Sequence, residues 1–149
     1  MGKRYSISHQ ATNTAAKCLL GLTGAASIRP RVYDLICGSD ADPADNAAEY
    51  NLLRTTAPGS GGTAITPQAI DADDPASSAS AIGATYSTEP TVAGVMLSWA
   101  QNQRATFRWV AAPNGEIVLP AVANNGVAVR TIDVAGSAVN TNVMMHYEE

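Results

Sequence analysis

The last third of the chain, residues 104–149, constrains the fold most strongly. It consists of short apolar runs separated by Pro, Gly and Asn residues. Within it, Phe107 and Trp109 alternate with Thr106 and Arg108. This two-residue period is typical of a β-strand with one buried face and does not fit a helix. The region therefore predicts antiparallel sheet.

Turn signals divide this region into several strands. Two Asn-Gly dipeptides, at residues 114–115 and 125–126, accept the positive φ angles of tight turns. Apolar residues of the strands that follow alternate as well, at Val127, Val129, Val143, Met145 and Tyr147. The pattern predicts stacked antiparallel strands whose function depends on surfaces and not on a cleft.

Earlier parts of the chain repeat the strand pattern. The segments concerned are residues 3–9, 17–22, 31–37, 50–56 and 92–99. In the last of these, we expect Val95, Leu97 and Trp99 to share one face. Helix signals gather only near Asp42 and Pro43, where one or two helical turns are expected.

Residues 57–90 differ in composition, being rich in Gly, Ser, Thr, Ala, Pro and Asp. A stretch of this length without regular structure usually marks a binding loop or a disordered linker. Ile65, Ile70 and Ile82 recur in it as isolated apolar residues that can anchor the chain to a surface. We therefore predict an ordered arm or wrapped loop.

These patterns together predict one all-β domain over residues 1–149. About eight strands form an antiparallel β-sandwich, and two four-stranded sheets in jelly-roll order account for the turn spacing. Trp99, Phe107 and Trp109 are expected in the core, because they share their alternation with aliphatic residues. Cys18 and Cys37 lie in apolar runs and are expected to be buried free thiols.

The charge content limits the function classes. The formal net charge is -4, and only 15% of residues are charged. This balance argues against binding nucleic acid through phosphates. A weakly charged surface suits a subunit that buries its faces in an assembly. No apolar run suits a signal peptide or a membrane span, so we expect a cytosolic protein that does not enter a membrane.

No constellation for catalysis or metal binding stands out. His9 and His146 are the only candidate imidazole bases, and no G-x-S-x-G elbow accompanies them. The acidic run at residues 39–46 departs from the calcium-loop pattern. The sequence leaves open that carboxylates converge as in a glycosidase, the candidates being Asp34, Glu49, Glu89 and Glu116. We predict a protein that is not an enzyme and that needs no metal or cofactor.

Three segments carry a resemblance to a known group. They are PADNAAEYNLLRTTAPGSGGTAITPQAID, NQRATFRWVAAPNGEIVLPA and the terminal VMMHYEE. Over residues 40–149 the chain resembles small virion proteins of tailed phages and is similar to capsid decoration, or cement, proteins with a jelly-roll or related fold. The resemblance implies a homotrimer that bridges major capsid proteins on the outer shell of the virion, assembled in the host bacterial cytoplasm.

Two functions follow as hypotheses. As a cement subunit, the chain would contact the capsid or its own copies through the N-terminal strand and the 57–90 arm, the candidate residues being Arg4, Tyr5, Ile65, Ile70 and Ile82. The alternative is a carbohydrate- or receptor-binding module of a phage tail or collar. An exposed aromatic platform beside Trp99 or Trp109 would favour this alternative.

Overall fold

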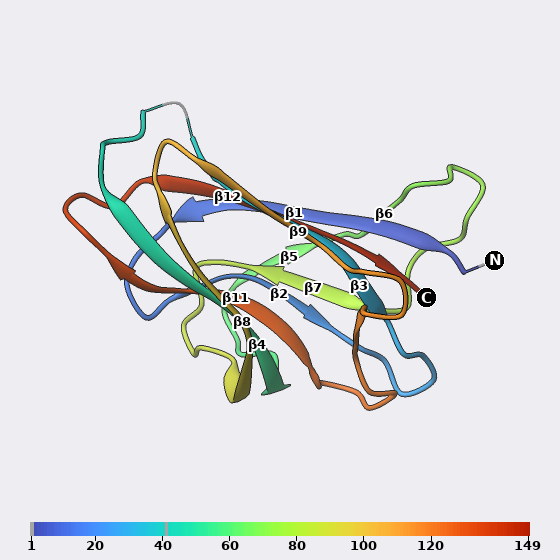
Figure 1. Ribbon diagram of the computed structural model, residues 1–149. Helices are drawn as coiled ribbons and strands as arrows, with labels where there is room; N and C mark the ends of the chain where they lie inside the picture. Colours follow the sequence, from blue (N-terminus) through green and yellow to red (C-terminus); the bar gives the residue numbers. More distant parts are fainter. Residues whose placement is uncertain (1, 41) are drawn as a thin grey trace.

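A computed structural model describes residues 2–40 and 42–149. Two antiparallel β-sheets pack face to face, as Figure 1 shows, and the prediction of an all-β antiparallel sandwich is confirmed. The strands of the described residues are, in chain order, β1 (Arg4–Thr12), β2 (Cys18–Thr23), β3 (Arg31–Ser39), β4 (Ala47–Ala57), β5 (Thr63–Ile65), β6 (Gln68–Ala69), β7 (Ser80–Gly83), β8 (Thr91–Asn102), β9 (Thr106–Val110), β10 (Ile117–Val118), β11 (Gly126–Val134) and β12 (Asn140–Glu148).

Eight of these strands follow jelly-roll order. Sheet A contains β1-β12-β3-β9, and sheet B contains β2-β11-β4-β8. Successive strands along the chain therefore cross repeatedly between the sheets, as in two interlocked Greek keys. The four remaining strands are short additions at the sheet edges: β6 and β10 in sheet A, and β5 and β7 in sheet B.

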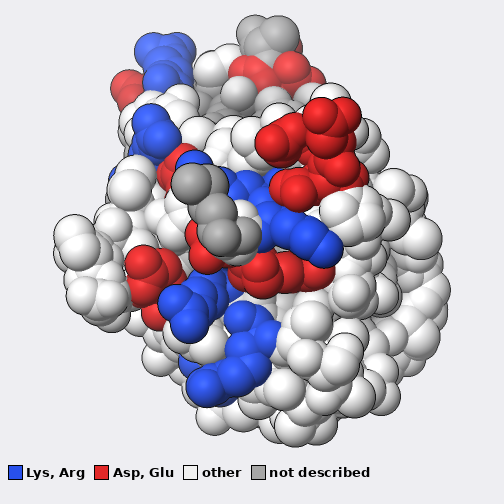
Figure 2. Space-filling view, turned by 90° about the vertical axis from the view of Figure 1, so that its right-hand side faces the viewer, with Lys and Arg blue, Asp and Glu red and all other residues white. Residues whose placement is uncertain are grey.

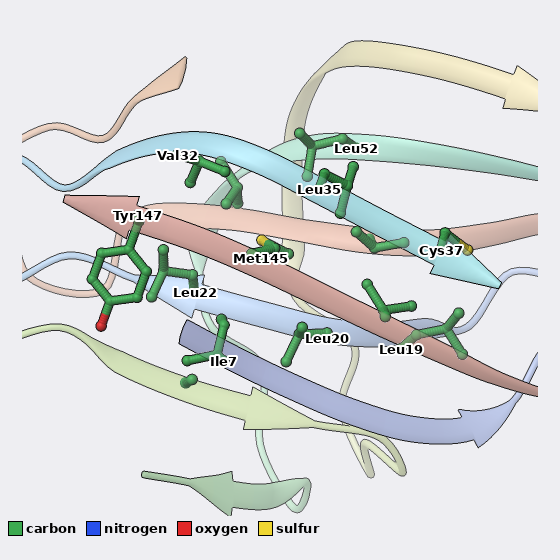
Figure 3. Packing of buried hydrophobic residues seen from close by; sticks show 14 of the residues in the cluster. Ile7, Leu19, Leu20, Leu22, Val32, Leu35, Cys37, Leu52, Met145 and Tyr147 are labelled. Atoms are coloured by element: carbon green, nitrogen blue, oxygen red, sulfur yellow. The ribbon is translucent and has the colours of Figure 1, made fainter. Parts of the chain in front are cut away.

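The core lies between the sheets and is formed by alternate residues of the long strands. Figure 3 shows aliphatic side chains from β1, β2, β3, β4 and β12 converging there. The largest fully buried side chains of this core are Tyr5, Ile7, Leu19, Leu20, Leu22, Leu35, Tyr50, Leu52, Leu119, Met145 and Tyr147. Each fully buried aliphatic side chain of this size stabilises the fold by about 1.5–3 kcal/mol relative to exposure.

Two β-bulges change which side chains face the core. In β2, a register shift against β11 makes Leu19 an extra residue, so Leu19 and Leu20 both pack in the core while Cys18 packs in a separate cluster. In β8, a shift against β4 pairs Leu97 with Leu52 but Val95 with Leu53. Because adjacent residues of β4 point to opposite faces, Val95 and Leu97 do so too.

Two sequence-based expectations are therefore corrected. Val95 does not share the buried face of Leu97 and Trp99, since the bulge turns it outward and leaves it 58% exposed.

The expected helical turns near Asp42 and Pro43 do not form, and residues 42–46 make an irregular connection to β4. A capping residue and a proline favour the start of a helix, but they do not offset the free-energy cost of nucleating one.

The 57–90 segment is ordered, and it contains three short strands that the sequence did not predict. It adds β5 to the edge of sheet B, crosses to sheet A to pair β6 with β1, and returns to insert β7 between β5 and β2. β1 also lies against β2 and β7. The segment therefore closes the side of the sandwich where β1 and β2 meet; we call it the insertion.

Tyr86 fixes the end of the insertion to the outer face of sheet B. Its ring is buried with Cys18, Ala128 and the half-buried Ile82. Its hydroxyl donates a hydrogen bond of 2.7 Å to the carbonyl oxygen of Ile82. Nearby, the side chain of Glu89 accepts from the backbone N–H of Cys18. A second, smaller apolar cluster thus forms on the outside of sheet B.

The two chain ends lie side by side at one end of the sandwich (Figure 1). Lys3 and Glu149 exchange two backbone hydrogen bonds of 3.1 and 2.8 Å. The described part of the chain forms no helix with the length and apolar character needed to cross a membrane.

Replacing Tyr86 tests how the insertion is held. Tyr86→Ala should lower the free energy of unfolding by about 3 kcal/mol, because it removes a large buried ring. The change should also make residues 57–90 the first site of limited proteolysis. Tyr86→Phe is the control, since it keeps the ring, loses only one hydrogen bond and should cost about 1 kcal/mol. Equal protease resistance of Tyr86→Ala and the unmodified protein would contradict this role.

Candidate functional site

Two of the predicted contact residues meet at the end of the sandwich that holds the chain termini. The backbone N–H of Ile70 donates a hydrogen bond of 2.8 Å to the carbonyl oxygen of Arg4. The Ile70 side chain is 52% exposed, and the Arg4 side chain is also exposed. Both line an open hollow of about 500 Å³, together with Asp71 and Asp74. The first strand and the insertion thus form one surface, which we call the terminal surface.

The other predicted contact residues lie elsewhere. Tyr5 is fully buried, which corrects the expectation that it contributes a surface contact. Its ring stacks on Tyr147 with centroids 5.5 Å apart, and its hydroxyl donates to the carbonyl oxygen of Pro75. Tyr5 therefore anchors the insertion from within. Ile65 and Ile82 are half-buried, Ile65 against the main core and Ile82 beside Tyr86.

The insertion is further tied to the chain end by Glu149. Its carboxylate accepts hydrogen bonds from the backbone N–H groups of Ser78 and Ala79, at 3.1 and 2.9 Å, and from the Ser77 hydroxyl. Charge-assisted bonds of this kind are stronger than neutral ones. The terminal surface is consequently preformed rather than assembled on binding.

Charged side chains gather on this end of the molecule. Figure 2 shows Lys and Arg side chains interleaved with Asp and Glu side chains over the middle of the view, while much of the remaining visible surface is uncharged. A second hollow, of about 250 Å³, lies here and is lined by Arg4, Arg31, Tyr33, Glu116 and Glu148. Because it is lined by two arginines and two carboxylates, this hollow can accept both negatively and positively charged groups of a ligand.

Trp99, Phe107 and Trp109 lie between the sheets. Trp99 is buried, and its ring stacks on Phe107 at 4.5 Å and on Tyr50 at 5.6 Å between centroids. Phe107 and Trp109 are half-buried and pack against the core. The Tyr50–Trp99–Phe107 stack joins β4 and β8, the last two strands of sheet B, to β9 of sheet A. Trp99 therefore offers no open indole face to a ligand.

A polar cluster that the sequence did not predict lies on the outer face of sheet A. Asp34 on β3 is buried and accepts two hydrogen bonds from the Arg108 guanidinium on β9, at 3.0 and 2.7 Å. His146 on β12 places Nδ1 3.5 Å from the same carboxylate, and its ring lies 6.0 Å from that of Tyr33. The neighbouring strands β3, β9 and β12 thus contribute Asp34, Arg108 and His146, respectively.

The Arg108 hydrogen bonds set the ionisation of Asp34. They hold the pKa of the Asp34 carboxyl below its usual range, and the nearby His146 acts in the same direction. Burial acts in the opposite direction but does not prevail. Asp34 is accordingly a carboxylate at neutral pH, with Arg108 as its counter-ion, and is not poised as a general acid.

A β-bulge explains why Asp34 lies on the outer face. Tyr147 pairs with Val32 and His146 with Asp34, so Tyr33 is an extra residue in β3. Without the bulge, Val32 and Asp34 would point to the same face. The only sequence signal was a charged residue inside an apolar run, which does not identify its partners.

The candidate acids of a glycosidase are divided between the two sheets. Asp34 lies on sheet A and Glu116 precedes β10 of that sheet, whereas Glu49 is exposed on β4 and Glu89 lies beside Cys18 on sheet B. The four therefore do not form one site. Within residues 2–40 and 42–149, no group of three or more His, Cys, Asp or Glu side chains is arranged to hold a metal ion.

Both cysteines are free and buried, as predicted. Burial raises the pKa of each thiol to about 12, and the neighbouring Glu89 carboxylate adds to this effect at Cys18. Such thiols are inert, because the thiolate is the reactive form.

Comparisons with protein-family models, with curated proteins and with solved structures found no match for this chain.

The Asp34–Arg108 pair makes a testable pH prediction. A carboxyl group with a depressed pKa stabilises the fold above its unfolded-state pKa of about 3.9, and this stabilisation is lost as the pH falls through the lower folded-state value. Arg108→Gln should therefore raise the pKa of Asp34, measured by NMR of its carboxyl carbon. The variant should be destabilised at pH 7 but much less so near pH 2.

Arg104→Gln provides the matched control, because it removes the same charge from the exposed turn between β8 and β9. It should leave the pKa of Asp34 unchanged. An Asp34 titration that is identical in all three proteins would disprove the assigned role of Arg108.

The cysteines allow a second test. In the native protein, neither thiol should react with a disulfide reagent at pH 8 over an hour, whereas both should react within minutes in urea. A native protein that consumes one equivalent of reagent rapidly would show that Cys18 or Cys37 is accessible after all.

Proposed function

We propose that this chain is a structural virion subunit that decorates the outer capsid and stabilises it by bridging neighbouring major capsid proteins. The observation that carries the proposal is the terminal surface, where β1 and the insertion present exposed Ile70 and Arg4 on a preformed support. This placement agrees with the contacts that the cement hypothesis expects at the N-terminal strand and the 57–90 segment. The jelly-roll sandwich and the low charge content are consistent with it.

The terminal surface suits a docking contact physically. Ile70 supplies an apolar centre, and the charged side chains around it supply a rim that can select a complementary partner. Because Glu149 and Tyr5 already hold the insertion, little conformational entropy is lost on binding. In the implied homotrimer, three such contacts would also reinforce one another, since the later contacts form within one complex.

Sedimentation with capsids tests the proposal. Capsids are assembled from the major capsid protein of the same phage without this chain. When the purified protein is added, it should pellet together with these capsids. Ile70→Asp should weaken this co-sedimentation at least tenfold, because it puts a charge at the centre of the contact. Val122→Asp is the matched control, because Val122 is 50% exposed but lies in the loop before β11. Failure of the unmodified protein to pellet would refute the cement function.

The alternative function, carbohydrate or receptor binding, has support from a different observation. The hollow of about 250 Å³ combines Tyr33 with arginine and carboxylate side chains, groups that also recognise sugar hydroxyls. Trp99 supplies no aromatic platform, since it is buried in the ring stack. Binding on a glycan array that Tyr33→Ala abolishes would favour this alternative over the cement function.

A further inference from the structure

The edges of the two sheets are protected very unevenly. β5, β6 and β10 contain two or three residues each, and β9 contains five. β8 is the exception, because it forms the outer edge of sheet B and is the longest of the described strands, with twelve residues. The insertion covers the β1 side of the sandwich, and no strand of the described chain pairs with the outer edge of β8. Its outward backbone donors and acceptors are thus available to another strand.

β8 also lacks the charges that normally guard such an edge. It is the only described strand of nine or more residues without Lys, Arg, Asp or Glu, as the other five each carry at least one. It contains no proline either. Soluble proteins usually place charges or proline on exposed edge strands, since these residues prevent pairing with other chains.

The side chains of β8 are small or apolar and accessible. All residues from Thr91 to Val95 are exposed, and Val95 is one of the most exposed large apolar residues at 58%. Nothing lies within 4 Å of the position where a Cβ atom of Gly94 would stand. Farther along, Ser98 and Ala100 are exposed on either side of the buried Trp99, so they point to the outer face.

We propose that β8 pairs with β8 of a second copy of this chain, antiparallel and across a two-fold axis, so that the two B sheets become continuous. Charge is the argument for a second copy. In an antiparallel two-fold pair only residues near the axis meet their own copies, and a charge there would face a like charge. β8 carries no charge at any position, so every register of the pair is free of like-charge repulsion. The inference does not depend on the capsid function.

The geometry of the edge limits the pairing. Three register shifts relative to β4 distort β8 up to Leu97, whereas the ladder from Leu97 to Asn102 is regular. Bulges weaken pairing, so the regular half supplies the ordered hydrogen bonds. Because the other edges are short, the pair is closed and does not grow into a fibre. Two-fold pairing cannot build the implied homotrimer, but it would join copies from neighbouring trimers.

Distances between spin labels test the pairing directly. Single cysteines are placed at three exposed positions, Ala93, Ser98 and Ala100, while Cys18 and Cys37 stay buried and unlabelled. The distance between like labels should change by about 7 Å per residue along the strand, twice the strand rise. No position of the axis on β8 makes all three distances equal. A label on Ala112, in the loop after β9, is the control, and its distance should not fit the dependence on position found along β8.

Light scattering of charge variants provides the second test. The unmodified protein should reach twice the chain mass of 15.4 kDa as concentration rises, with little effect of salt. The double variant with Ser98→Lys and Ala100→Lys should stay monomeric with unchanged circular dichroism, because four added charges meet in the pair. Ala112→Lys adds charge in an exposed loop and should still dimerise.

Three results would overturn the proposal. They are an unmodified protein that remains monomeric at millimolar concentration, a double variant that still dimerises, and label distances that do not depend on position. If a monomeric protein binds capsids and the two lysines abolish that binding, β8 accepts a strand of another protein and the second copy is the wrong partner. Failure to bind capsids with the β8 pair intact would refute the cement function alone.

Discussion

Backbone hydrogen bonding at the sheet edges is the constraint on which the rest of this structure depends. A sandwich buries its apolar side chains between two sheets, but that core does nothing for the outward N–H and C=O groups of the last strands. The insertion satisfies this need on one side, because β5, β6 and β7 extend both sheets with short strands and Tyr5 and Glu149 hold the connecting loop. β8 on the other side has no such cover. The sandwich therefore has a preformed terminal surface on the side that the insertion covers and an unpaired edge strand, β8, on the other side.

The alternation of apolar residues was sufficient to predict the fold class and the strands of the jelly roll, because a two-residue period follows directly from strand geometry. It failed where a bulge interrupts that period. Leu19, Tyr33 and Met96 are each one extra residue, and each reverses the faces of the residues beyond it. Whether a bulge forms depends on the neighbouring strand, which is far away in sequence. The short strands of the insertion were missed for a related reason, since two or three residues are too few to establish a period.

The candidate site, too, was predictable from the sequence only in part. Ile70 and Arg4 were identifiable as an isolated apolar residue and an N-terminal cation, and the pairing of β6 with β1 brings them together. Tyr5 was misplaced because an alternating strand has two faces and the sequence did not specify which one the core would take. The Asp34 cluster needs one residue from each of β3, β9 and β12. Only the strand order of sheet A makes these residues neighbours, so no local pattern could have found them.

Low charge content has a definite meaning only once the strand order is known. The 15% of charged residues are not spread evenly, because charged side chains crowd the end of the molecule that Figure 2 shows and β8 has none. Charge at the terminal surface favours a partner with a complementary pattern, whereas an uncharged edge imposes no such selection and tolerates an identical strand. β1 and β8 lie toward opposite sides of the sandwich in the strand order. A pair formed through β8 would therefore leave both terminal surfaces accessible, and the two contacts are compatible within one assembly.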